Sequence, residues 1–215
     1  MKHVTQIQAA DDSSMKAPTR RALAKQQTRA KVLASARALF SEQGYEGATI
    51  RDIAASAGMS TGAVFANFSD KSDLFREIML TDMEALADAM REAATHGNGV
   101  EDVLQRMFAA GYGFYKTQLP LARAAFSVGW SSEDGPALRN AAPVQVLHAL
   151  IAEQLSRAVE RGELTGGDME LRGQMLFEAY LSNYPQAIFG GWTVEALQDR
   201  AGHQIRILLA GARRS

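Results

Sequence analysis

Side chains that could contact the base edges of double-stranded DNA lie in the segment 60–67. Thr61 and Asn67 supply a hydroxyl and an amide for hydrogen bonds. Small residues that allow close backbone approach or contact with a thymine methyl group are Gly62, Ala63 and Ala66. The segment has no arginine to bind guanine, so we expect limited base discrimination from it alone. We expect DNA shape, with Arg29 and Arg51 outside the segment, to supply part of the specificity.

Two short helices joined by a tight turn are predicted to position these residues. Thr49 is a good N-cap, and apolar residues follow it at helical spacing: Ile50, Ile53, Ala54 and Ala57. Gly58 ends the first helix, and Ser60 can cap a second. The inward side chains of the second helix are expected to be Val64, Phe65 and Phe68. This pattern is typical of a helix-turn-helix, although other all-helical proteins also contain a short helix, a glycine turn and another helix.

The charges in front of this motif are one-sided. Between Ser13 and Ser41 every charged side chain is basic: Lys16, Arg20, Arg21, Lys25, Arg29, Lys31 and Arg37. The whole chain has a formal net charge of -1, so the remainder must be acidic. A polyanion such as DNA would be drawn to one end of the molecule. The alternative is that the basic run is a solvated arm. The two interpretations are compatible if residues 1–18 are a disordered tail.

The region resembles the DNA-binding domain of the tetracycline-repressor (TetR) family of bacterial transcription regulators. The resemblance covers residues 29–78 and rests on these positions, in family order and spacing: Ala36, Leu39, Phe40, Gly44, Tyr45, Thr49, Ile53, Ala54, Ala57, Gly58, Ser60, Gly62, Val64, Phe65, Phe68, Lys71 and Leu74. It implies a homodimeric, all-helical repressor whose second domain binds a small molecule. Binding of that molecule would change the spacing of the two DNA-reading heads.

The same resemblance implies individual roles. Thr49 matches a position that meets a phosphate, and residues 60–63 match the start of the recognition helix. Lys71 matches a phosphate-binding lysine. Phe65 and Asn67 stand where the family commonly has Tyr and His against the DNA backbone. Because Phe65 has no hydroxyl, one phosphate hydrogen bond is expected to be lost, whereas Asn67 can still donate one.

Length and composition allow one domain of ordinary size or two smaller ones, and the helical pattern with the family resemblance predicts an all-α protein with two domains. At 215 residues and 47% hydrophobic, the chain can bury a substantial core. We expect a helix-turn-helix domain over 19–68 and a helical effector-binding and dimerisation domain over 69–215. The expected helices are near 20–43, 70–94, 100–117, 119–130, 136–161, 168–190 and 193–212.

A dimer interface is expected in the last two helices. Their apolar or small-residue stripes are Val194, Leu197, Ala201, Ile205 and Leu208 on the final helix, and Leu171, Met175, Ala179 and Ser182 on the one before. Two such helices from each subunit would form a four-helix interface. A repressor that reads a two-fold symmetric DNA site needs a second copy of itself. The alternative is that both stripes face their own core.

Aromatic residues at helical spacing mark a possible site for an effector. The candidate ligand-binding residues are Phe108, Tyr112, Phe126, Trp130, His148, Phe177, Tyr180 and Tyr184. Tyrosine and tryptophan bring a polar group to an apolar wall, which suits a partly aromatic or amphipathic molecule. The simpler interpretation is that these residues are core, and that His148 is a buried histidine satisfied by a carbonyl or water.

Enzymatic chemistry finds little support. The four histidines, at positions 3, 96, 148 and 203, lack metal-ligand spacing, and the sequence has neither a glycine-rich phosphate loop nor a G-x-S-x-G motif. We expect no cofactor and no metal. With zero cysteines and no apolar leader or membrane-length segment, a cytoplasmic protein is expected. The alternatives to an effector-released repressor are an effector-independent DNA-binding protein and an all-helical enzyme.

Overall fold

The helix-turn-helix head is built from three helices whose ends are capped by their own side chains. The computed structural model describes residues 19–116, 118–131 and 142–212, without the side chains of 126–131 and 142–143. The head helices are α1 (Arg20–Gly47), α2 (Ile50–Ser56) and α3 (Thr61–Phe65). The hydroxyl of Thr49 accepts from the backbone N–H of Asp52, and that of Ser60 accepts from Ala63, each at 3.2 Å. The predicted caps are therefore confirmed.

Two glycines end helices where the sequence predicts it. Gly58 has a φ of +67°, which turns the chain between α2 and α3, and Gly44 has a φ of +76°. The first helix is longer than expected, because helical residues resume after Gly44 and continue to Gly47. The predicted tail over 1–18 lies outside the described residues.

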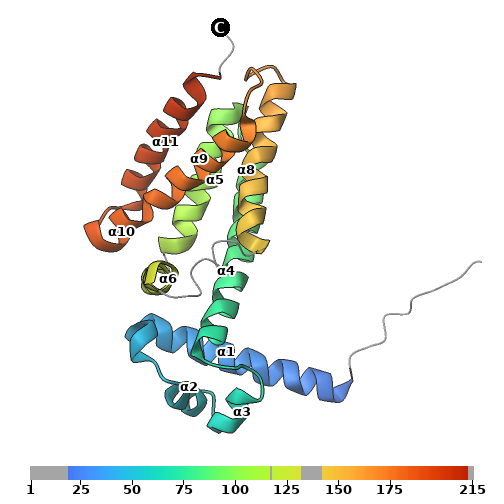
Figure 1. Cartoon of the computed structure of the whole chain (residues 1–215), viewed down its shortest axis with the longest axis vertical. Coiled ribbons are helices and arrows are strands. Elements are labelled where there is room, and N and C mark those ends of the chain that lie inside the picture. Colours follow the sequence, from blue (N-terminus) through green and yellow to red (C-terminus); the bar gives the residue numbers. More distant parts are fainter. Residues whose placement is uncertain (1–18, 117, 132–141, 213–215) are drawn as a thin grey trace, which may run out of the picture.

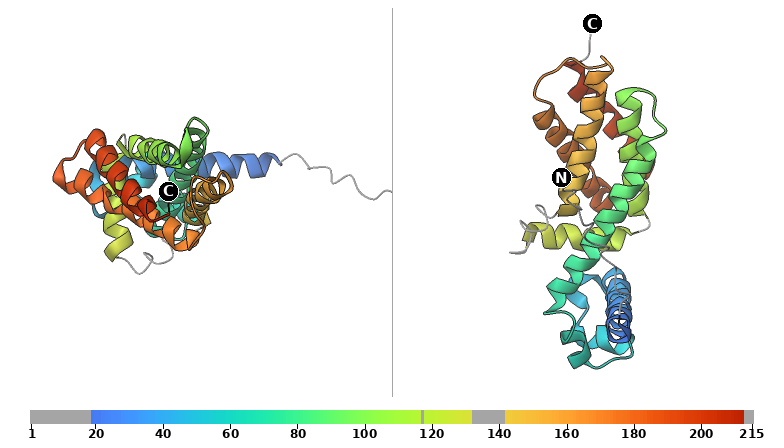
Figure 2. Two further views of the ribbon diagram at one scale, coloured as in Figure 1. Left: turned by 90° about the horizontal axis from the view of Figure 1, so that it is seen from above. Right: turned by 90° about the vertical axis from the view of Figure 1, so that its right-hand side faces the viewer.

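The body above the head is a bundle of long helices. Its members are α4 (Lys71–Ala94), α5 (Gly99–Lys116), α8 (Ala142–Glu160), α9 (Met169–Ser182) and α11 (Val194–Ala210). Two shorter helices, α6 (Leu119–Ser131) and α10 (Tyr184–Gly190), lie at the end of the bundle nearest the head (Figures 1 and 2). All secondary-structure elements in the described ranges are helices, and none of them is long and apolar enough to cross a membrane.

The helix expected over 168–190 is two helices in the structure. The first ends at Ser182 and the second begins at Tyr184, with Pro185 in its first turn. A proline fits there because its missing N–H has no intrahelical partner to lose, whereas it would clash inside a continuous helix. The prediction of a single helix over 168–190 was therefore wrong. Pro185 is the signal in the sequence that marks the break. The helix expected over 136–161 is described only from Ala142, as residues 132–141 lie outside the described part.

Two cores divide the molecule, and they share α4. The head core contains Val32, Phe40, Ile53 and Val64, all fully buried, together with Leu74 from the first turn of α4. It also includes Leu121 and Ala124 from α6, so α6 joins head to body. The second half of α4 contributes Leu86 and Met90 to the larger body core.

Candidate nucleic-acid interface and ligand cavity

The recognition segment presents an exposed surface at the end of the head farthest from the body. Thr61, Gly62, Phe65 and Ala66 are exposed on α3 and just after it, whereas Val64 is fully buried. The N-cap Ser60 is also exposed. A short helix that begins at an exposed cap and buries one residue can insert its other faces into a groove of DNA.

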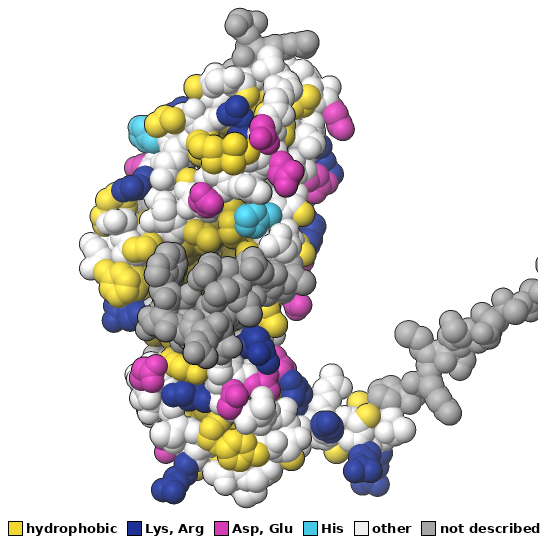
Figure 3. All heavy atoms as spheres, viewed as in Figure 1, with side chains coloured by type: hydrophobic (Ala, Val, Ile, Leu, Met, Phe, Trp, Pro, Cys, Tyr) yellow, Lys and Arg dark blue, Asp and Glu magenta, His cyan; other side chains and the backbone are white. Residues whose placement is uncertain are grey.

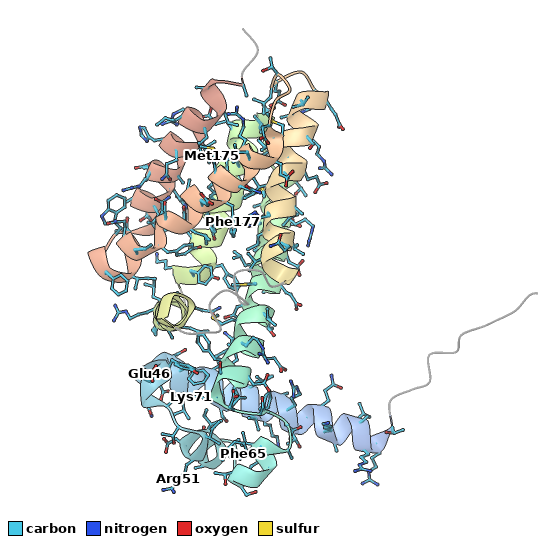
Figure 4. The ribbon with its side chains drawn as sticks, viewed as in Figure 1. Glu46, Arg51, Phe65, Lys71, Met175 and Phe177 are labelled. Carbon is cyan, nitrogen blue, oxygen red and sulfur yellow. The ribbon has the colours of Figure 1, made fainter. Side chains whose placement is uncertain are left out.

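Phe65 corrects the sequence prediction that it points inward. Its side chain is 55% exposed, because Val64 and Phe68 occupy the inward face and the next helical position lies about 100° round the axis. In Figure 4, Phe65 and Arg51 lie at the lower edge of the head. An exposed aromatic ring between Gly62 and Ala66 is the largest apolar group on this surface.

The residues of α2 that were predicted to contact DNA are accessible. Thr49 is exposed, and its hydroxyl both caps α2 and donates to the carboxylate of Asp52 at 2.6 Å. Arg51 is exposed, and no carboxylate within the described ranges pairs with it. Its guanidinium is therefore available for a phosphate or a narrow groove.

Arg29 is used inside the head. Its Nε donates to Glu77 at 3.0 Å, its Nη1 donates to the carbonyl of Asn67 at 2.5 Å, and its guanidinium lies 4.2 Å from the centre of the Phe68 ring. These contacts hold the end of the recognition segment between α1 and α4. The geometry therefore favours a positioning role for Arg29 over the direct DNA contact that the sequence suggested.

Lys71 and Asn67 are also partly engaged. Lys71 Nζ donates to the carbonyls of Tyr45 at 2.8 Å and Ala48 at 3.3 Å, next to the end of α1. Asn67 donates from its amide to the carbonyl of Ala63 at 3.0 Å, while its Oδ1 is buried without a hydrogen-bond partner. Each side chain keeps at least one further N–H, so a phosphate contact remains chemically possible for both.

A cavity of about 230 Å³ lies at the lower end of the body, between α5, α6, α10 and α11. Its walls are mainly aromatic and aliphatic. The lining residues are Tyr112, Tyr115, Lys116, Leu119, Tyr184, Ala187, Trp192, Thr193, Val194, Glu195 and Leu197. The volume suits a small molecule with an apolar body.

The structure brings only part of the predicted ligand set to this cavity. Tyr112 and Tyr184 line it, whereas Phe108, Phe177 and Tyr180 are buried in the body core and are not among its lining residues. The half-buried ring of His148 packs 4.0 Å from that of Phe177, and burial lowers the pKa of the histidine. The side chains of Phe126 and Trp130 lie outside the described residues.

Other lining residues are not among the candidates named above. The aromatic spacing of the sequence does include Tyr115, three positions after Tyr112, and the structure places it at the cavity. Trp192 reaches the cavity because Gly191, with a φ of +67°, ends α10 and reverses the chain. Lys116 and Glu195 bring opposite charges to the same cavity from α5 and α11. Only the tertiary arrangement places these residues together.

The hydroxyls of two lining residues, Tyr112 and Tyr184, are already hydrogen-bonded within the protein. Tyr112 donates to the carbonyl of Tyr180 at 3.2 Å and accepts from Asn183 at 2.9 Å, and the hydroxyls of Tyr180 and Tyr184 bond to each other. Burial raises the pKa of all three tyrosines, so they remain neutral. A bound molecule would therefore meet mostly ring faces, with Lys116 and Glu195 as the charged partners.

The two stripes expected at a dimer interface have different environments. On α11, Leu197, Ala201 and Ile205 are buried in the body core, so this stripe faces its own chain and its assignment to the interface was wrong. On α9, Leu171 is 51% and Met175 is 44% exposed, as the prediction requires. Figure 4 labels Met175 in the upper part of the body. The large apolar residue that α11 leaves exposed is Ile207.

Comparisons with known proteins agree with this arrangement. Residues 32–78 match the family described as "Bacterial regulatory proteins, tetR family". The chain is 27% identical to the HTH-type transcriptional repressor AcnR of Corynebacterium glutamicum, over 80% of the chain and 87% of that protein. It is 40% identical to AcnR of Corynebacterium diphtheriae over 38% of the chain, a match spanning 40% of that relative. Its fold is similar to that of the fatty acid degradation regulator FadR from Bacillus halodurans, with a TM-score of 0.68, 19% identity, and coverage of 85% of this chain and 94% of that one.

Proposed function

The chain belongs to the tetR family of bacterial regulatory proteins, and we propose that it is a homodimeric transcriptional repressor released from DNA by a small molecule. The observation that carries the DNA-binding part is the exposed surface of α3, with Thr61, Gly62 and Phe65 outward and Val64 buried. The relative AcnR, which is named a transcriptional repressor, supports the direction of regulation. A protein bound to the bacterial chromosome would work in the cytoplasm.

The DNA-contacting set follows from exposure and chemistry. Thr49, the N-cap of α2, and Arg51 within it would meet phosphates, and residues 60–63 would enter the major groove. Phe65 would lie against the DNA backbone and contact apolar parts of the sugars, since it has no hydrogen-bonding group. Asn67 and Lys71 would add backbone contacts from the N–H groups that they do not use internally.

Selection of binding sites from a random duplex library, followed by a mobility-shift assay, tests this function. The variant Ala66→Glu places a carboxylate on the exposed side of the recognition segment, where it would repel phosphates, so binding should fall at least about tenfold. Ala85→Glu is the matched control, because Ala85 is also exposed but lies midway along α4. Equal affinity of the two variants, or failure of the wild-type chain to select any site, would refute the proposal.

Pairing of two chains would use the exposed face of α9. Leu171 and Met175 leave apolar surface in solvent, and Ile207 on the neighbouring α11 is 74% exposed. These residues can pack against their copies across a two-fold axis, burying surface that is unfavourable in water. Half-sites separated by about one helical turn of DNA require such a pair of heads.

The effector would occupy the cavity between α5 and α11. By linkage, the effector shifts the protein between a DNA-binding and a released form only to the extent that it binds one form more tightly. About a 10⁴-fold difference in affinity is needed to convert nearly all molecules from one form to the other. Thermal-shift screening with small apolar molecules, followed by mobility shift with each hit, tests this. Hits that stabilise the protein yet leave DNA binding unchanged would favour an effector-independent DNA-binding protein.

A further inference from the structure

The outer end of α1 extends beyond the head as a helical arm (Figure 1). Every residue from Arg20 to Gln27 is exposed, and the first buried residue of α1 is Val32. The family match begins at residue 32, so the arm precedes the matched segment. We name residues 20–27 the basic arm. Nothing in its packing explains its presence.

The basic arm carries three cations and no acid. Arg20, Arg21 and Lys25 are exposed, and none of them pairs with a carboxylate in the ranges 19–116, 118–131 and 142–212. Two other arginines of the same helix behave differently, because Arg29 pairs with Glu77 and Arg37 pairs with Asp82. The charges of the arm are thus left without internal compensation, and they repel one another at close spacing.

The register of α1 places Arg21 and Lys25 on the side of the helix away from the body. Arg37 reaches Asp82 and Gln118, so its direction marks the side of α1 that faces the body. At about 100° per residue, Arg21 lies about 160° and Lys25 about 120° round the helix from that direction. Figure 3 shows Lys and Arg side chains gathered under the outer end of α1, on the side of the molecule where α3 lies.

We propose that the basic arm binds the phosphate backbone of the duplex beside the stretch entered by α3. This inference rests on the proposed function, and it adds a second, sequence-independent contact to the one made by the recognition segment. Duplex DNA presents about one negative charge per 1.7 Å of its axis, which offers several phosphates to an arm of eight residues at 1.5 Å per residue. Charge complementarity selects DNA over an apolar partner, because Leu23 is the one large apolar residue of the arm that is exposed.

The experiment measures how binding depends on salt. The full chain and the variant Arg20→Gln/Arg21→Gln/Lys25→Gln are titrated by fluorescence anisotropy against an arbitrary duplex of about 30 base pairs, between about 50 and 200 mM KCl. Each neutralised phosphate contributes about 0.9 to the slope of log K against log salt concentration, so the slope should fall by about 2 to 3. At the lowest salt the variant should bind at least about tenfold more weakly.

A matched control separates local contact from overall charge. The variant Arg91→Gln/Arg106→Gln/Arg157→Gln makes the same change in net charge at exposed positions on the body, where each arginine is in a surface ion pair. Its salt slope should equal that of the wild-type chain. Because every residue of the basic arm is exposed, its variant should keep the wild-type helical content, which circular dichroism checks.

Each outcome bears on one proposal. An unchanged slope in the arm variant overturns the inference while leaving the DNA-binding function intact. An equal loss in both triple variants also overturns it, since only net charge would then matter. Failure of the wild-type chain to bind any duplex refutes the proposed function itself. The inference is supported if the salt slope is reduced in the arm variant alone. The arm variant should then lose affinity by the same factor on an arbitrary duplex and on a selected site.

Discussion

Arg37 of α1 and Asp82 of α4 form an ion pair at the junction between head and body. The Nη1 of Arg37 donates to Asp82 at 3.0 Å and to the side-chain oxygen of Gln118 at 2.9 Å. Asp82 is only 4% exposed, whereas the Arg37 side chain is about a third exposed. One guanidinium therefore links the head, the long helix α4 and the residue that precedes α6.

Removing Arg37 should destabilise the fold. Arg37→Leu leaves the Asp82 carboxylate buried without its cation, which we expect to cost about 2 to 3 kcal/mol, less than a fully buried pair because the arginine is partly solvated. Urea unfolding followed by circular dichroism measures the loss. The double variant Arg37→Leu/Asp82→Leu should recover part of it, since no uncompensated charge remains. Strict additivity of the two single changes would contradict the pairing.

The same junction places the cavity next to the head. Gln118 accepts from Arg37, and its neighbours in sequence, Lys116 and Leu119, line the cavity. Further along α6, Leu121 is buried in the head core. A molecule that displaces Leu119 would therefore act on a helix that packs against both the head core and the body core, which is a physical route from occupancy to head position.

Phe65→Tyr should strengthen DNA binding. The ring is exposed, so the added hydroxyl has room and can donate to a phosphate oxygen. A net gain of about 1 kcal/mol corresponds to about a fivefold lower Kd. Mobility shift on a selected site measures it, with Phe65→Ala as the companion that removes the ring. The free energy of unfolding should change little in either variant, and a weaker complex for Phe65→Tyr would place the ring away from the backbone.

Met175→Glu should prevent dimerisation. The change puts a carboxylate in the centre of the exposed face of α9, and two copies would meet across a two-fold axis. Analytical ultracentrifugation should report a monomer with an unchanged helical spectrum. Phe189→Glu is the matched control, because Phe189 is also apolar and is 72% exposed, but on α10. If both variants remain dimeric, the interface lies elsewhere.

The head was largely predictable because its signals are local. Caps at Thr49 and Ser60, the turn at Gly58 and the buried Val64 each depend on residues within a few positions. The inward placement of Phe65 failed because a helix this short has room for few buried residues, and Phe68 takes the second inward place.

The sites in the body were less predictable because they depend on distant contacts. The engagement of Arg29 requires Glu77, which is 48 positions away, and no periodicity reveals such a pair. The stripe on α11 is apolar whether it faces a partner or its own chain, so pattern alone could not assign Leu197 or Ile205. The cavity collects residues from four helices, and only their packing brings Trp192 and Tyr115 to one cavity.

Four tyrosines make stability depend on alkaline pH. Burial raises the pKa of Tyr112, Tyr115, Tyr180 and Tyr184 above the ordinary value of 10.0. A raised pKa in the folded state means that, above pH 10, the unfolded chain loses phenolic protons that the native chain keeps. The stabilisation is fully present below that pH and decreases as the pH rises further.

The expected result is cooperative alkaline unfolding. Each tyrosine lowers the free energy of unfolding by about 1.4 kcal/mol per pH unit once its unfolded form is ionised, so the four together give about 5 kcal/mol per unit. Tyrosinate absorbance and helical circular dichroism, recorded together from pH 8 upward, should change in one transition. Tyr115→Phe should make the dependence shallower by one proton. The opposite result would be that tyrosinate forms near its ordinary pKa while the helical content stays native. Solvent would then reach these hydroxyls, which would contradict the burial of the four tyrosines.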